Sequence, residues 1–234
     1  CNHEISKKIA DKYKGVVVDK LTDDFLNTVH WISLCTPTDT HYSYLTNLLN
    51  LENKFILCEK PVTYQLQEID KLKDLYNNTS PTIYVNYIRR FQSSYINFKE
   101  KYSEVLKLNK LKKCSIDYCR GFINNASHAF DTLEFLFSTP LQLNNVSISK
   151  EVYHDLENDP TVSLNAKWEN ANIIVNGHKG NSNSIFQIKL EFDSHSVEFL
   201  NAGNDIIIYN KRDKKASVFY QTDFSTVELP QVDV

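Results

Sequence analysis

The chain has 234 residues, of which 41% are hydrophobic and 24% are charged, and its formal net charge is −3. This composition is typical of a globular protein, and the slight negative charge predicts no nucleic-acid partner and no anionic membrane partner. No apolar run approaches the roughly 20 residues of a membrane-spanning helix. The five cysteines include no Cys-x-x-Cys pair. Free thiols in a reducing cytoplasm are therefore favoured over a disulfide framework or a zinc site.

The first ninety residues alternate between short apolar strands and amphipathic helices. The hydrophobic pattern predicts strands at residues 16–18, 29–35, 55–58 and 82–86, and helices at 6–13, 22–27, 40–49 and 64–76. Near-continuous apolar runs such as 29–35 are typical of parallel strands that are covered on both faces. Because strands that alternate with helices build right-handed βαβ units, this half is predicted to be α/β with a Rossmann-like parallel sheet.

Beyond residue 87 the pattern changes to that of an α+β domain. Helices are predicted at residues 93–106 and 126–137, and strands at 113–120, 143–153, 162–168, 172–176, 184–192, 196–201, 206–209 and 217–221. Turn signals separate the later strands, which predicts an open, mainly antiparallel sheet that meanders. The predicted domains are therefore residues 1–87 and 88–234.

Three motifs carry candidate chemistry. Thr36-Pro37-Thr38-Asp39-Thr40-His41 follows the strand at 29–35, and Cys58-Glu59-Lys60-Pro61 closes the strand at 55–58. Asn124-Asn125-Ala126-Ser127-His128 opens the helix at 126–137. In an open α/β sheet, ligands bind at the carboxyl ends of the strands, so the first two motifs lie where a ligand is expected.

The residue types suit the oxidation of an alcohol. Such a reaction needs a base for the hydroxyl proton and a cation near the developing alkoxide. The imidazole of His128 suits the first task, and the ammonium group of Lys60 suits the second. A metal site built from His41, His128 and Asp131 has no recognised ligand spacing, and Ser127, His128 and Asp131 lack the spacing of a catalytic triad.

The order of these motifs, with Val85-Asn86-Tyr87 and Arg89-Arg90-Phe91 between them, resembles the Gfo/Idh/MocA family (glucose–fructose oxidoreductase, inositol dehydrogenase and rhizopine catabolism) over nearly the whole chain. Members are NAD(P)-dependent oxidoreductases with a Rossmann domain followed by an α/β domain on an open sheet. The resemblance implies hydride transfer between NAD or NADP and a hydroxyl or carbonyl group of a sugar, nucleotide-sugar or cyclitol. It also implies a homodimer or homotetramer formed through the C-terminal sheet.

The resemblance assigns roles residue by residue. Lys60 and His128 are expected to be catalytic, and His41 either contacts the cofactor or caps its helix. Asn124 stands where the family often has an aspartate, and an amide cannot take a proton. Asp131 lies one helical turn past His128, where it is catalytic, binds substrate, orients the His128 ring or pairs with an arginine, and a structural role is favoured over a catalytic one. The expected substrate-binding residues are Asn124, Arg89 and Asp131, and the expected cofactor-binding residues are Asn2, Cys35, Thr36, Pro37, His41, Glu59 and Lys60.

One family feature is missing from the sequence. No Gly-x-Gly-x-x-Gly turn occurs, although such a turn binds the pyrophosphate in dinucleotide folds. By the resemblance, Cys1 falls near the end of the family's second strand, so the chain is expected to be an N-terminally incomplete copy. Two alternatives to the enzyme stay open: a non-catalytic ligand-binding or regulatory relative of the same fold, and a chain that binds no dinucleotide.

Overall fold

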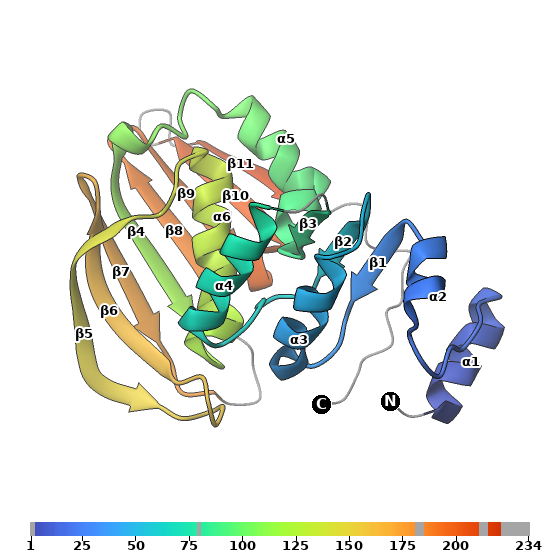
Figure 1. Cartoon of the computed structure of the whole chain (residues 1–234). Coiled ribbons are helices and arrows are strands. Elements are labelled where there is room, and N and C mark those ends of the chain that lie inside the picture. The colour runs from blue at the N-terminus through green and yellow to red at the C-terminus, as the bar shows by residue number, and fades with distance from the viewer. Residues whose placement is uncertain (1–2, 79–80, 181–184, 211–214, 221–234) are drawn as a thin grey trace. The chain divides into compact units, whose positions relative to one another are not determined.

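The structure is a computed structural model that describes residues 3–78, 81–180, 185–210 and 215–220. The chain divides into two compact units, Cys1–Asn86 and Tyr87–Val234 (Figure 1). Asn2, an expected cofactor residue, lies outside the described residues. Within the described part of the chain, no helix is long and apolar enough to cross a membrane.

The first unit is built on a three-stranded parallel sheet in the order β1-β2-β3. Its strands are β1 (Trp31–Leu34), β2 (Phe55–Cys58) and β3 (Thr82–Val85), and its helices are α1 (His3–Tyr13), α2 (Asp23–Thr28), α3 (Thr38–Leu48) and α4 (Leu66–Tyr76). Leu34 is level with Cys58, and Cys58 is level with Val85, so the three strands end at one edge. The predicted Rossmann-like parallel sheet is confirmed.

The core of the first unit lies between this sheet and the helices α3 and α4. Ile56 of β2, Leu45 of α3 and Leu72 of α4 are all buried in it. Side chains alternate across a strand, so the other face of the sheet carries Trp31 and Phe55. Their rings stack with centroids 4.6 Å apart while Trp31 remains 71% exposed. Aromatic surface is therefore left accessible on that face.

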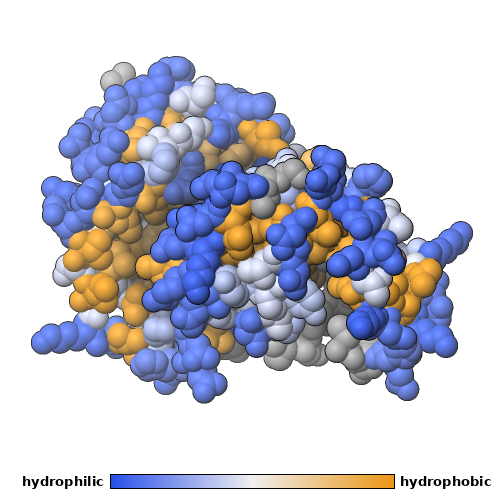
Figure 2. Space-filling model, viewed as in Figure 1, coloured by the Kyte–Doolittle hydropathy of each residue, from blue (hydrophilic) through white to orange (hydrophobic). Residues whose placement is uncertain are grey.

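The predicted strand at residues 16–18 is wrong. The segment is irregular, and Val16 is 86% exposed. A strand is stabilised by its ladder, and no described strand pairs with this segment. The helix before it, α1, also has no buried residue, and its apolar side chains Ile5 and Ile9 are exposed. Figure 2 shows hydrophobic residues at the surface in this part of the unit.

The second unit is built on an eight-stranded sheet in the order β11-β10-β9-β8-β4-β7-β6-β5. The strands are β4 (Leu111–Tyr118), β5 (Leu143–Tyr153), β6 (Thr161–Trp168), β7 (Ala171–Gly177), β8 (Phe186–Phe192), β9 (His195–Leu200), β10 (Asp205–Asn210) and β11 (Lys215–Tyr220). Neighbours are antiparallel except β4 and β7, which run parallel. The mainly antiparallel sheet is confirmed. The predicted meander holds within β5-β6-β7 and within β8-β9-β10-β11, and it is wrong only where β4 separates β7 from β8.

The position of β4 explains that error. It enters between β7 and β8, which are consecutive in sequence but not adjacent in the sheet. Cys114, Ile116 and Tyr118 of β4 are fully buried. A strand with such a buried apolar face is most stable in the centre of a sheet, where both of its edges and that face are covered.

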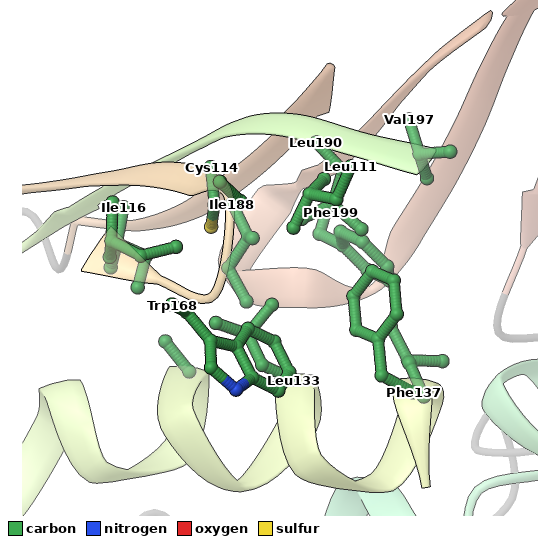
Figure 3. Close-up of a cluster of buried hydrophobic side chains, with 14 of the residues drawn as sticks. Leu111, Cys114, Ile116, Leu133, Phe137, Trp168, Ile188, Leu190, Val197 and Phe199 are labelled. Carbon is green, nitrogen blue, oxygen red and sulfur yellow. The ribbon is translucent and has the colours of Figure 1, made fainter. Parts of the chain in front are cut away.

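Two helices cover one face of this large sheet. They are α5 (Ser93–Lys101) and α6 (Ser127–Phe137), and shorter helical turns are η1 (Ile88–Phe91), η2 (Leu108–Lys110), η3 (Phe122–Ala126) and η4 (Asn201–Gly203). Tyr95 of α5 stacks on Phe199 with ring centroids 5.6 Å apart. Phe137 of α6 meets Trp168 edge to face at 5.3 Å (Figure 3). The first contact holds α5 against the sheet, and the second holds α6, the helix that carries His128.

Candidate functional site

The ends of the three parallel strands collect the polar residues of the first unit. Thr36 follows β1, Glu59 and Lys60 follow β2, and Asn86 follows β3. The ladder continues past the strands, because the Glu59 N–H donates to the Leu34 carbonyl at 3.0 Å. The Asn86 N–H likewise donates to the Cys58 carbonyl at 2.7 Å. These backbone bonds bring the polar residues to one edge of the sheet.

Glu59 is held in place by Asn86. The Asn86 side-chain amide donates to Oε1 of Glu59 at 2.6 Å, and both residues are half-buried. Lys60 is half-buried as well and precedes Pro61 through a cis peptide bond. Asn86 was missed as a site residue by the sequence interpretation. Its place directly after the third strand, at the ligand-binding edge, was the available signal.

The turn after β1 leads into α3. Pro37 is the residue before the first helical turn, and the Thr40 hydroxyl lies 2.8 Å from the Thr36 hydroxyl. Cys35 is exposed, and its Sγ lies 3.2 Å from Oγ of Ser33. This turn therefore presents hydroxyl groups beside the Glu59 turn.

His41 is fully buried between the two turns. Its Nδ1 lies 3.0 Å from the Pro61 carbonyl oxygen, and its Nε2 lies 2.8 Å from the Thr36 carbonyl oxygen. The sequence interpretation expected a cofactor contact or a helix cap here. In the structure both ring nitrogens contact backbone carbonyls of the two turns, and the cofactor contact of His41 stays a prediction.

Cys58 lies under the same turns. Its Sγ is 3.8 Å from Nδ1 of His41 and donates to the Glu59 carbonyl at 3.3 Å. Burial, followed by the nearby Glu59 carboxylate and Cys35, raises the pKa of the Cys58 thiol to about 12. The group is therefore a neutral thiol at physiological pH and not a nucleophile.

In the second unit, His128 is the second residue of α6 and is half-buried between two aromatic rings. The Tyr87 ring meets it edge to face at a centroid distance of 5.6 Å, and the Phe186 ring does so at 6.5 Å. Burial raises the pKa of Tyr87, and the nearby Ser127 side chain opposes that shift. The two rings restrict the orientation of the imidazole.

The start of this helical segment is bound by residues 159–161. A helix leaves its first N–H groups without partners inside the helix. Here four consecutive N–H groups, those of residues 121–124, donate to this short segment. The donors and acceptors are Gly121 to Thr161 Oγ1 (2.8 Å), Phe122 to the Pro160 carbonyl (3.1 Å), Ile123 to Asp159 Oδ1 (2.8 Å) and Asn124 to Asp159 Oδ2 (2.6 Å).

Asp159 is 2% exposed although it is an acidic residue. Its two carboxylate oxygens each accept one backbone N–H, and Gly121 leaves room for them because a Cβ at that position would overlap the carboxylate. Gly121 also has a φ of 89°, which favours glycine. The sequence interpretation missed this residue. An aspartate directly before a proline between two apolar strands was a weak turn signal only.

The predicted substrate residues are engaged within the second unit. The Asn124 amide donates to the Arg120 carbonyl at 3.1 Å. Arg89 donates through Nη2 to the Ala202 carbonyl at 2.7 Å, and its guanidinium lies 4.0 Å from the centroid of the Phe186 ring. These contacts support the local structure, and the substrate contacts of both residues stay predictions.

Asp131 pairs with an arginine, which is one of the roles expected for it. Nε of Arg90 donates to Oδ1 of Asp131 at 2.7 Å, and the Asp131 side chain is only 9% exposed. Burial raises the pKa of Asp131, while the hydrogen bond and charge of Arg90 oppose the shift. Over the described residues, no group of three His, Cys, Asp or Glu side chains is placed to hold a metal ion.

We predict that Asp159→Ala lowers the free energy of unfolding by about 1–3 kcal/mol, because it leaves two buried N–H groups without acceptors. Chemical denaturation followed by circular dichroism measures the change. Asp193→Ala is the matched control, since Asp193 pairs with Lys112 at an exposed position and its loss should cost about 0–1 kcal/mol. Equal stability of the two variants would contradict the role given to Asp159.

Comparison with protein families gives one match. Residues 2–87 match the model of the GFO_IDH_MocA oxidoreductase family, described as an NAD-binding Rossmann fold. Comparison with curated proteins finds no match. The family match covers the first unit, in which the strand-end residues lie.

Several solved structures share the fold over most of the chain. UDP-N-acetylglucosamine 3-dehydrogenase GnnA from Acidithiobacillus ferrooxidans is 14% identical with a TM-score of 0.73, and the match covers 93% of this chain and 72% of that one. An inositol dehydrogenase homolog from Azotobacter vinelandii, complexed with NAD+, is 14% identical with a TM-score of 0.67. The match covers 82% of this chain and 57% of that one. A super-repressor mutant of Gal80p from Saccharomyces cerevisiae is 12% identical with a TM-score of 0.76. The match covers 94% of this chain and 70% of that one. At these identities the likeness establishes a common fold.

Proposed function

We propose that this chain, whose first unit belongs to the Gfo/Idh/MocA oxidoreductase family as its NAD-binding Rossmann domain, transfers a hydride between NAD or NADP and a hydroxyl or carbonyl group. The substrate class we propose is a sugar, nucleotide-sugar or cyclitol. One observation carries the proposal: Thr36, Glu59, Lys60 and Asn86 meet at the carboxyl ends of three adjacent parallel strands. That edge is where open α/β sheets bind ligands.

The residues at this edge fit the nicotinamide end of a dinucleotide. Hydroxyl groups of Thr36 and Thr40, the Glu59 carboxylate and the Asn86 amide offer donors and acceptors for a ribose and a carboxamide. When bound, the nicotinamide ring supplies the acceptor or donor of the hydride. The 234-residue sequence contains no Gly-x-Gly-x-x-Gly turn for the pyrophosphate, so cofactor binding is the first point to test.

Lys60 and His128 are the proposed catalytic residues. The Lys60 ammonium group would stabilise the negative charge that develops on the substrate oxygen, and the His128 imidazole would take or return the hydroxyl proton. The edge-to-face contacts of Tyr87 and Phe186 support this role of His128, because they restrict its orientation. Asn124, Arg89 and Asp131 are the proposed substrate-binding residues.

We predict that NADH or NADPH binds to the purified chain with a dissociation constant in the micromolar range that is common for enzyme ligands. Isothermal titration calorimetry with each of the two cofactors measures the affinity. The ratio of the two dissociation constants shows whether the chain prefers the cofactor with or without the phosphate on the adenosine 2′ oxygen. Adenosine monophosphate, which lacks the nicotinamide, is the matched control ligand. Failure of both cofactors to bind would remove the oxidoreductase proposal.

We predict that Lys60→Ala lowers kcat by about 10²–10⁴-fold, as does His128→Asn, because each removes one group that acts on the reacting hydroxyl. The cofactor affinity should change little in either variant. The double variant should lose hardly more than each single one, because groups that act in one step are not additive. Steady-state kinetics measure these effects, and Lys71→Ala, at an exposed position of α4, is the control. Unchanged turnover in Lys60→Ala would contradict its role.

A second candidate is a non-catalytic relative that keeps the fold as a regulatory or ligand-binding module. The likeness to the Gal80p super-repressor mutant, with a TM-score of 0.76, favours it, and so does Asn124, whose amide cannot take a proton. This candidate predicts cofactor binding without turnover of any sugar or cyclitol. The kinetic comparison of Lys60→Ala with the unchanged chain separates the two candidates.

We also propose that the chain forms a homodimer or homotetramer through the face of the large sheet that α5 and α6 do not cover. That face is polar and carries ion pairs between strands: Lys189 with Glu198 at 2.8 Å and Lys113 with Glu191 at 3.7 Å. Sedimentation velocity at micromolar concentration should show a dimer or a tetramer. A monomer alone would refute the assembly and leave the oxidoreductase proposal untouched.

A further inference from the structure

The buried imidazole of His41 contacts two turns that are distant from each other in the sequence. One is the Thr36-Pro37 turn after β1, and the other is the Glu59-Lys60-Pro61 turn after β2. His41 lies on α3 and is 0% exposed. Its Nε2 lies 2.8 Å from the Thr36 carbonyl oxygen, and its Nδ1 lies 3.0 Å from the Pro61 carbonyl oxygen.

Both partners are carbonyl oxygens, which only accept hydrogen bonds. A neutral imidazole has one N–H and donates to one of them, whereas an imidazolium donates to both. Toward these two carbonyls the ring can only donate, through one nitrogen when neutral and through both when charged, and both ring nitrogens face backbone atoms. A side chain that only filled a space in the core would not need a nitrogen atom at each carbonyl.

The link lies beyond the reach of the sheet. Among the described residues, the last backbone hydrogen bond between the two strand ends runs from the Glu59 N–H to the Leu34 carbonyl. Thr36 and Pro61 lie past that bond, where the chain leaves the ladder. His41 therefore holds together the parts of the two turns that the sheet no longer aligns.

We propose that His41 is a positioning residue that fixes the Thr36-Pro37 turn against the Glu59-Lys60-Pro61 turn. Its consequence for catalysis rests on the proposed function: the position of the Lys60 backbone at the nicotinamide would then depend on a residue that touches neither cofactor nor substrate. Small displacements of a reacting group are costly, since a shift of about 1 Å can lower a rate about 10²-fold.

Two substitutions separate the two contacts. In His41→Asn the side-chain nitrogen takes the place of Nδ1, so the Pro61 contact is kept and the Thr36 contact is lost. In His41→Gln the nitrogen takes the place of Nε2, so the Thr36 contact is kept and the Pro61 contact is lost. His30→Asn, at an exposed position of the same unit, is the matched control.

Amide hydrogen exchange on the full chain reads the two turns independently of any cofactor. We expect His41→Asn to speed exchange at residues 36–40 about tenfold and to leave residues 59–63 unchanged, and we expect His41→Gln to do the reverse. His30→Asn should alter neither region. Equal acceleration of both regions in both variants, or in neither, overturns the proposal because it indicates a space-filling role.

Cofactor titration and steady-state kinetics test the functional consequence of the two His41 substitutions. If the unchanged chain binds NADH or NADPH, both His41 variants should weaken that binding by about tenfold and lower kcat, while the Lys60→Ala variant lowers kcat alone. If the unchanged chain binds neither cofactor, the proposed function fails. The exchange pattern then still decides whether His41 joins the turns.

A measurement on the unchanged chain needs no substitution. An imidazole N–H that donates to a buried carbonyl is protected from exchange with water, so the nuclear magnetic resonance spectrum should show a slowly exchanging ring N–H of His41. This supports the proposal even if both variants fail to fold. Rapid exchange of every His41 ring proton overturns it.

Discussion

The proposed chemistry of the first unit depends on backbone hydrogen bonds between parallel strands. The ladder makes Leu34, Cys58 and Val85 level, so the residues that follow them emerge at one edge of the sheet. Glu59 and Asn86 then bond to each other across that edge. Because parallel strands share a direction, the ladder brings together side chains that are up to fifty residues apart in sequence, and this convergence gives the edge its capacity to bind a ligand.

The second unit uses a different device to place its candidate base. There the helix that carries His128 begins on four N–H groups, and the segment at residues 159–161 accepts all of them. A carboxylate at a helix start also interacts favourably with the helix dipole. In each unit a buried side chain contacts backbone groups near the candidate residue. In the first unit the His41 imidazole contacts two carbonyls near Lys60, and in the second the Asp159 carboxylate accepts two N–H groups near His128.

The sequence predicted the elements with strong hydrophobic periodicity. The strand at 55–58 and the long strand at 143–153 match the structure residue for residue, and the helix at 126–137 differs by one residue at its start. The strand prediction was wrong at residues 16–18, where three consecutive valines favour a strand by intrinsic preference alone. Strand formation needs a partner strand, and intrinsic preference carries no information about partners.

The sequence by itself determined the fold class, the family of the first unit and the motifs at the strand ends, because these follow from local periodicity and from residue order. Only the tertiary structure decided that β4 lies in the middle of its sheet, that Asp159 binds the start of the His128 segment, and that His41 faces two carbonyls. Each of these facts is a contact between distant parts of the chain. Hydrogen-bond geometry and burial choose such partners, and neither quantity is written in the spacing of residues along one strand or helix.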